Sequence, residues 1–174
     1  MNKHVFSALT ALCLLLGAAA LAQSQQPPKK DPGPAAVMLR QWNDVGNKLV
    51  AMAEDFPEDK YDYRPNDQVR TFAQQLLHVA ASMYYATNPA LGKPVDKIDE
   101  NPSRDTYKTK AQIVAFVKKC VEDGAAAIQQ GGDAGVIKHI GDWSGIVEHS
   151  GEHYGQLVVY YRNNGMVPPE SRKK

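Results

Sequence analysis

Cysteine is scarce in this chain, which has two among its 174 residues. Cys13 lies in an apolar segment at the N-terminus, so the rest of the chain holds only Cys120 and no internal disulfide is expected. Cys120 falls on the apolar side of a predicted helix, which is typical of a small core residue rather than of a reactive thiol. A chain of this length without disulfides is expected to form one domain that is stabilised by its hydrophobic core.

The chain also lacks an excess of charge and an alternating apolar pattern. Its 20 Lys and Arg residues face 19 Asp and Glu, and the balance becomes even once Lys3 of the N-terminal segment is left out. This balance gives no support for nucleic-acid binding or for electrostatic attachment to a membrane surface, so no nucleic-acid partner is expected. No window alternates apolar and polar residues with period two, so we expect an all-α fold without a sheet.

Long apolar runs are missing except at the N-terminus. There a short basic start precedes residues 5–21, which are almost wholly apolar, and Ala20-Leu21-Ala22 offers small residues for cleavage. This pattern predicts a signal peptide at residues 1–22, and hence a secreted or periplasmic protein with no stable membrane insertion after cleavage. A retained membrane anchor is the alternative, although the run is shorter than most spanning helices.

Residues 23–34 are rich in Gln, Pro and Lys, which is typical of a flexible leader, and residues 35–174 are expected to form the folded domain. Four amphipathic helices are predicted in that domain. The first carries apolar residues at spacings of three and four from Met38 to Phe56, and Pro57 stops it.

The other three helices have recognisable ends. The second and third each begin with a capping box, T-F-A-Q from Thr71 and T-K-A-Q from Thr109. Gly131-Gly132 is expected to end the third helix. The fourth spans residues 143–165, with its terminal glycine as the residue that follows the helix.

The segment between the second and third helices, residues 88–108, contains three prolines and shows no convincing period. A segment of this length without secondary structure is uncommon in a compact domain unless it crosses the body or covers a site. At about 3.3 Å per residue it is long enough to run the length of a bundle. We therefore predict a four-helix bundle with a long crossover loop that packs along or across the bundle.

Histidines provide the candidate site. His149 and His153 lie four residues apart on the fourth helix, so both imidazoles project from one face and can hold one metal ion. His78 of the second helix is the candidate third ligand, on a stripe beside the buried face that looks into a polar cleft or out to water. His139, which precedes the fourth helix, is interpreted as a loop residue, although it could act as a substitute ligand. Spacing alone leaves open a structural bundle without metal.

The H-S-G-E-H segment also fits the inverted zincin pattern, in which Glu152 would act as a general base between two zinc-binding His. That pattern needs a further acidic ligand well downstream. Glu152 also points roughly 100° around the helix from His153, toward solvent. Peptidase chemistry is therefore not favoured.

Three stretches carry a resemblance to a known family. They are A-E-D-F-P-E-D-K-Y-D-Y-R-P near the end of the first helix, T-F-A-Q-Q-L-L-H-V-A in the second, and H-S-G-E-H-Y-G-Q-L-V-V-Y-Y-R-N-N-G-M-V-P-P-E-S after the third. Together they make the chain similar to the DinB/YfiT-like metalloenzymes over residues 37–171. The last two stretches are the more specific, because they combine a His in the second helix with H-x-x-x-H followed by G-Q and G-x-x-P-P.

The resemblance implies a four-helix bundle that binds a divalent metal, zinc or nickel among others, through His78, His149 and His153. Some members use the metal to activate a cytosolic low-molecular-weight thiol, whereas this chain carries a predicted export signal, so hydrolysis and group transfer both stay open. The substrate is expected to be a small molecule, and no catalytic residue is identified. A non-catalytic metal- or ligand-binding module of the cell envelope is the alternative, and a homodimer stays open.

Overall fold

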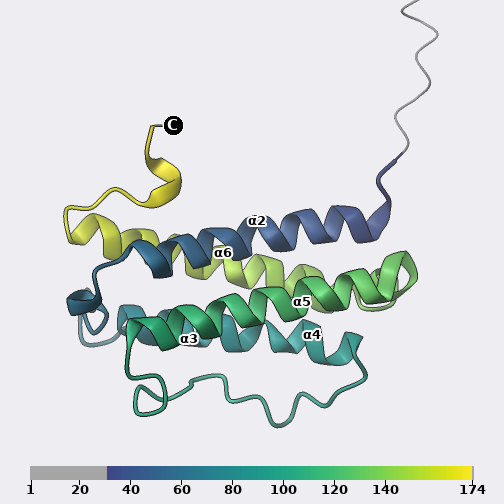
Figure 1. The fold of residues 1–174 in the computed structure, drawn as a ribbon, viewed down its shortest axis with the longest axis horizontal. Helices are drawn as coiled ribbons and strands as arrows, with labels where there is room; N and C mark the ends of the chain where they lie inside the picture. The colour runs from purple at the N-terminus through teal and green to yellow at the C-terminus, as the bar shows by residue number, and fades with distance from the viewer. Residues whose placement is uncertain (1–30, 174) are drawn as a thin grey trace, which may run out of the picture. The chain divides into compact units, whose positions relative to one another are not determined.

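A computed structural model describes residues 31–173 of the chain (Figure 1). The predicted signal peptide and most of the predicted leader lie outside the described residues. Within residues 31–173 every element is helical and there is no strand, which confirms the all-α prediction. The helices are α2 (Gly33–Asp55), α3 (Phe72–Ser82), α4 (Tyr84–Ala90), α5 (Lys110–Lys138) and α6 (Ile140–Asn163), with short 3-10 helices η1 (Glu58–Lys60) and η2 (Pro169–Ser171).

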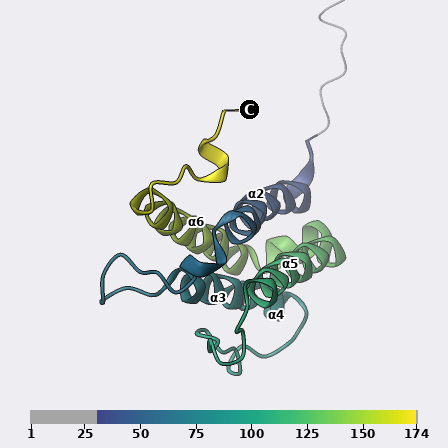
Figure 2. The same ribbon diagram turned by 60° about the vertical axis from the view of Figure 1, so that its left-hand side comes forward.

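These helices form a four-helix bundle in which α3 and α4 together occupy one position. α2 packs against α5 and α6, and α3 packs against the same two helices. Figure 2 shows α2 diagonally opposite α3 and α4. In Figure 1, α2 and α6 run in one direction along the bundle and α3, α4 and α5 run in the other. The bundle brings α6 beside α3, which places the two His-bearing helices next to each other.

α2 and α5 pack closely against each other because a glycine on each helix leaves room for a side chain of the other. A Cβ added to Gly124 would overlap the indole ring of Trp42, and one added to Gly46 would lie 2.6 Å from Val121 Cγ1. The Trp42 indole N–H donates to the Val121 carbonyl oxygen over 2.8 Å. Cys120 on the same side of α5 is fully buried, as the apolar pattern predicts.

Local sequence explains most helix ends. The Thr71 and Thr109 side chains accept from the backbone N–H groups of Gln74 and Gln112, and both glutamines reach back to complete the predicted capping boxes. At the end of α6, Gly165 has a φ of 68°. Its N–H donates to the Arg162 carbonyl, and the following N–H donates to the Tyr161 carbonyl, which together form a Schellman motif.

Several helix boundaries differ from the prediction. The second predicted helix is broken at Met83, after which the short helix α4 takes in the first residues of the segment expected to be loop. Regular α5 is interrupted at Gly132, which has a φ of 56°, but helical backbone resumes as far as Lys138 instead of ending at the glycine pair. α2 begins at Gly33, so the last residues of the predicted leader are helical.

Residues 91–109 form the crossover segment, which joins the parallel helices α4 and α5 and runs back along the bundle (Figure 1). Side chains tie it to residues 61–71, the segment that joins η1 to α3. The Arg104 guanidinium pairs with Asp62 over 3.0 Å, and Arg70 Nη2 donates to Asn101 Oδ1 over 3.0 Å. These contacts confirm the prediction of a packed crossover. Of the helices in residues 31–173, none has the length and apolarity that crossing a membrane requires.

Candidate metal centre

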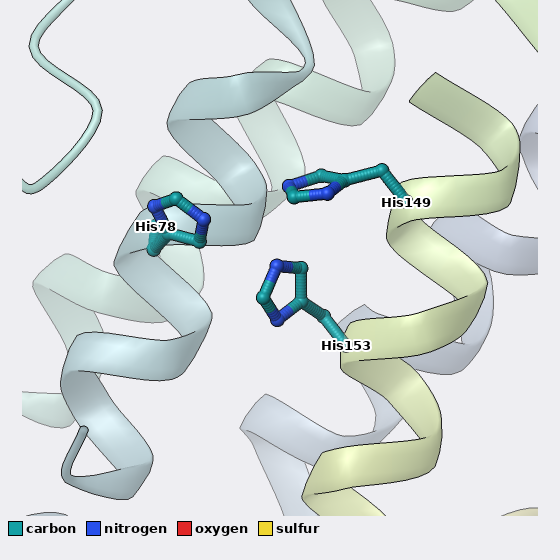
Figure 3. Close-up of side chains that lie close together, drawn as sticks. All are labelled: His78, His149 and His153. Carbon is teal, nitrogen blue, oxygen red and sulfur yellow. The ribbon is translucent and has the colours of Figure 1, made fainter. Parts of the chain in front are cut away.

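His78, His149 and His153 come together between α3 and α6. One ring nitrogen of each imidazole lies within 4.8 Å of the others, and the ring centroids are 4.3–5.4 Å apart. Figure 3 shows the three rings facing one another, His78 from α3 on one side and the two α6 residues on the other. The sequence predicted these three residues as one group, and the fold places them so. No other group of three or more His, Cys, Asp or Glu side chains within residues 31–173 is arranged to hold a metal ion.

The helical packing explains why these side chains meet. Trp143, Leu157 and Tyr161 are fully buried and fix the rotation of α6, which turns its His149 and His153 stripe toward α3. His78 is only 8% exposed and His153 only 6%. The alternative that His78 looks out to water is therefore wrong, because α6 and the crossover segment cover the stripe on which it lies.

His78 is oriented by the crossover segment. Its Nδ1 lies 2.8 Å from the backbone carbonyl oxygen of Glu100. A carbonyl oxygen can only accept, so His78 carries its proton on Nδ1 and presents the lone pair of Nε2 to the other two rings. A ligating imidazole usually has such an acceptor on its second nitrogen.

His153 has partners for both of its tautomers. Its Nδ1 lies 2.9 Å from Gln156 Oε1 and 2.5 Å from Gln75 Nε2, and Gln75 Nε2 also donates to Gln156 Oε1. When Nδ1 carries the proton it donates to Gln156, and Nε2 has a free lone pair that faces His78 and His149. The tautomer that a metal ion requires is therefore already supported by a hydrogen bond.

His149 provides the test of whether the three residues suit a metal ion. Its Nε2 is buried and has no hydrogen-bond partner among the described residues. A buried nitrogen without a partner is costly, and a metal ion at the centre of the three rings would satisfy it. With the lone pairs of His78 and His153 Nε2, it forms a set of three neutral nitrogen donors, which suits zinc and related divalent ions.

The protonation states of the two α6 histidines favour metal ligation at neutral pH. Burial lowers the pKa of His153 to about 4, and the charge of His149 acts in the same direction. Burial also lowers the pKa of His149, with a further contribution from His78. The positive charge of Arg70 adds to both effects, which places its guanidinium within electrostatic range of the site. Both imidazoles of α6 are therefore neutral at pH 7, as metal ligation requires.

Other residues considered from the sequence lie outside this group. His139 occupies the junction of α5 and α6, where its Nδ1 lies 3.2 Å from Asp142 Oδ2. Glu152 is exposed, in agreement with its position on the helix.

The sequence did not predict the groups that hold the rings, namely the Glu100 carbonyl and the Gln75 and Gln156 amides. The G-Q pair that follows H-x-x-x-H was the one local signal for Gln156.

Comparison with known proteins identifies the family. A family model described as the DinB superfamily matches residues 41–160, which is more than half of the chain and includes all three histidines. Among curated proteins no sequence matches the chain. The four-helix architecture and the three-His group agree with the family match. The chain belongs to the DinB superfamily.

Proposed function

We propose that the protein is an exported, divalent-metal-dependent enzyme that acts on a small molecule by hydrolysis or group transfer. The observation that carries the proposal is the partnerless buried Nε2 of His149, which lies beside two further imidazoles. Zinc or nickel is the expected ion, because the donor set consists of three neutral nitrogens. Localisation outside the cytoplasm rests on the predicted signal peptide.

A divalent ion bound by three neutral imidazoles keeps its full charge and open coordination positions, and supplies Lewis acidity to a bound group. The protein's own residues prepare the site. The Glu100 carbonyl and the Gln156 amide oxygen hold protons on the Nδ1 atoms of His78 and His153, so both lone pairs stay directed inward. Burial between α3, α6 and the crossover segment keeps water from the rings of His78 and His153.

A non-catalytic metal- or ligand-binding module is the second candidate, and one observation favours it. The described groups that hydrogen-bond to the three rings are two amides and a backbone carbonyl, none of which is a base of useful strength. An enzyme of this design must obtain its base from the metal-bound group or from the substrate. A non-catalytic module that only binds a metal ion or ligand needs no base.

Two measurements test the proposal. Calorimetric titration of metal-free protein with Zn²⁺ and Ni²⁺ is expected to give one ion per chain. Turnover of a panel of esters, amides and thiol acceptors is then compared with and without the ion. Metal binding without turnover across the panel would favour the non-catalytic module. Absence of metal binding would exclude both the metal-dependent enzyme and a metal-binding module.

Export has a test of its own. N-terminal sequencing of the protein from a fractionated host is expected to find Gln23 first, outside the cytoplasm. A cytoplasmic product that retains Met1 would contradict export and favour thiol transfer.

A further inference from the structure

A pocket of about 690 Å³ lies beside the three-His centre. Gln75 of α3 and Gln156 of α6 line it, and these are the same two amides that contact His153 Nδ1. The remaining walls come from the segment before α3 and from the last turns of α6: Pro65, Asn66, Gln68, Val69, Arg70, Val159 and Tyr160. This volume is within the range of small-molecule sites, which run from about 300 to 1,000 Å³.

Arg70 is the only charged residue in the pocket wall. Three other arginines, Arg64, Arg104 and Arg172, each pair with an aspartate. Arg70 instead donates from Nε and Nη2 to the neutral Asn101 side chain, over 3.3 and 3.0 Å, and enters none of the ion pairs between described residues. Its guanidinium is thus held in place without its charge being neutralised.

The rest of the wall is neutral and partly apolar. Val69 and Val159 are 40% and 49% exposed, which is unusual for valine, and Pro65 and Tyr160 extend this surface. Gln75 and Gln156 add amide groups that can both donate and accept. One cation, two amides and an apolar surface suit an anion of single charge with an apolar body. A planar carboxylate can accept from the Nη1 and Nη2 N–H groups of Arg70 that Asn101 leaves free.

We propose that this pocket binds a small organic carboxylate, with its carboxyl group on Arg70 and its apolar body against Val69, Val159 and Tyr160. The assignment of such an acid as the substrate, rather than simply a ligand, rests on the proposed function. The shared amides place the bound acid next to Nδ1 of His153, on the side of the ring away from the Nε2 atom that faces the metal centre.

The test measures binding of 3-phenylpropionate to the mature protein. Binding is detected from changes in the amide chemical shifts of ¹⁵N-labelled protein, with and without Zn²⁺. The probe is expected to shift resonances of Val69, Arg70 and Val159. Arg70→Gln is expected to weaken binding of the acid about tenfold, because it removes one charge-assisted hydrogen-bonded contact. Arg64→Gln is the matched control, because it removes the same charge from the same segment but lies outside the pocket wall.

Two further probes define the ligand class. The neutral 3-phenylpropionamide is expected to bind at least about tenfold more weakly than the acid, and Arg70→Gln should remove this difference. Equal binding of acid and amide, or an unchanged affinity in Arg70→Gln, would overturn the carboxylate assignment. Tighter binding of phenyl phosphate than of the acid would overturn it in favour of a phosphate. Arg70→Lys, which keeps the charge without the planar guanidinium group, should bind with intermediate affinity if the variants fold alike.

The measurement of acid binding at the pocket can be interpreted separately from the measurement of Zn²⁺ binding at the three histidines. Arg70→Gln should bind Zn²⁺ at least as tightly as the parent does, because Arg70 supplies no ligand and its positive charge opposes that of the ion. If the parent binds Zn²⁺ but not the acid, the pocket proposal fails and the metal centre stands. If the parent binds the acid but not Zn²⁺, the metal-dependent function fails and the carboxylate site stands.

Discussion

His78 Nδ1 lies 2.8 Å from the backbone carbonyl oxygen of Glu100, although 22 positions separate the two residues in the chain. The bond fixes which nitrogen of His78 faces His149 and His153. The Glu100 side chain is occupied elsewhere, since its carboxylate accepts from the Tyr85 hydroxyl over 2.5 Å. The contact therefore depends on the path of the crossover segment.

This bond predicts the coordinating atom of His78. Zinc binding should leave the proton on Nδ1 and change the ¹⁵N shift of Nε2, as followed by long-range ¹H–¹⁵N correlation spectra. His78→Ala should weaken zinc binding about 100-fold or more while the helical circular dichroism is kept, because the core does not depend on this ring. His139→Ala should bind zinc as the parent does. Parent-like affinity in His78→Ala would refute the three-His centre.

The two amides at His153 should differ in their effect on metal affinity. Gln156→Ala removes the acceptor of the Nδ1 proton and is expected to weaken zinc binding about 10- to 100-fold. Gln75→Ala removes a donor that competes for the same nitrogen, so it should leave affinity unchanged or slightly higher. Calorimetry on both variants makes the comparison. A larger loss in Gln75→Ala would mean that His153 uses the opposite tautomer.

The depressed pKa of His153 predicts acid sensitivity of the metal-free protein. Its pKa is about 4 in the folded state against 6.5 for an ordinary His, so between these values the unfolded chain binds more protons. This contribution to stability is complete above about pH 6.5 and is lost as pH falls toward 4. Urea unfolding between pH 7.5 and 4.5 should show a steeper decline for the parent than for His153→Gln. Parallel curves would show that the ring is not buried as described.

Glycine at position 124 is predicted to be a packing requirement. Gly124→Ala would place a methyl group against the Trp42 indole, and overpacking of this kind costs about 1–3 kcal/mol of unfolding free energy. Gly145→Ala on α6, whose added Cβ would meet no neighbour, should instead stabilise by about 0.5–1 kcal/mol. Thermal and chemical unfolding of both variants would measure the two effects. Equal changes in the two variants would argue against close packing of α2 on α5.

Features that depend on residues close together in the chain could be predicted from the sequence. Features that depend on contacts between residues far apart in the chain could not. The capping boxes at Thr71 and Thr109 and the glycine after α6 involve neighbours within a few residues, and all three were predicted correctly. The break at Met83 and the helical turn beyond Gly132 were not, because no proline or cap at these positions marks them.

The candidate site divides in the same way. The spacing of His149 and His153 fixed their shared face, His78 was a candidate from its place on the second helix, and the resemblance joined the three as ligands of one metal ion. The Glu100 carbonyl carries no side-chain signature, and nothing in the local sequence shows that Arg70 contacts Asn101 rather than an acidic side chain. Both contacts form only when the crossover segment packs against the rest of the bundle.

The use of a main-chain acceptor for His78 has a consequence for how the site tolerates sequence change. Every residue type has a carbonyl, so substitutions at position 100 should leave this acceptor in place. Insertion or deletion of one residue on either side would instead displace it by about 3.3 Å, more than the length of the bond. Surface loops usually accept such length changes at little cost in stability. In this segment the number of residues, rather than the identity of residue 100, determines whether His78 keeps its acceptor.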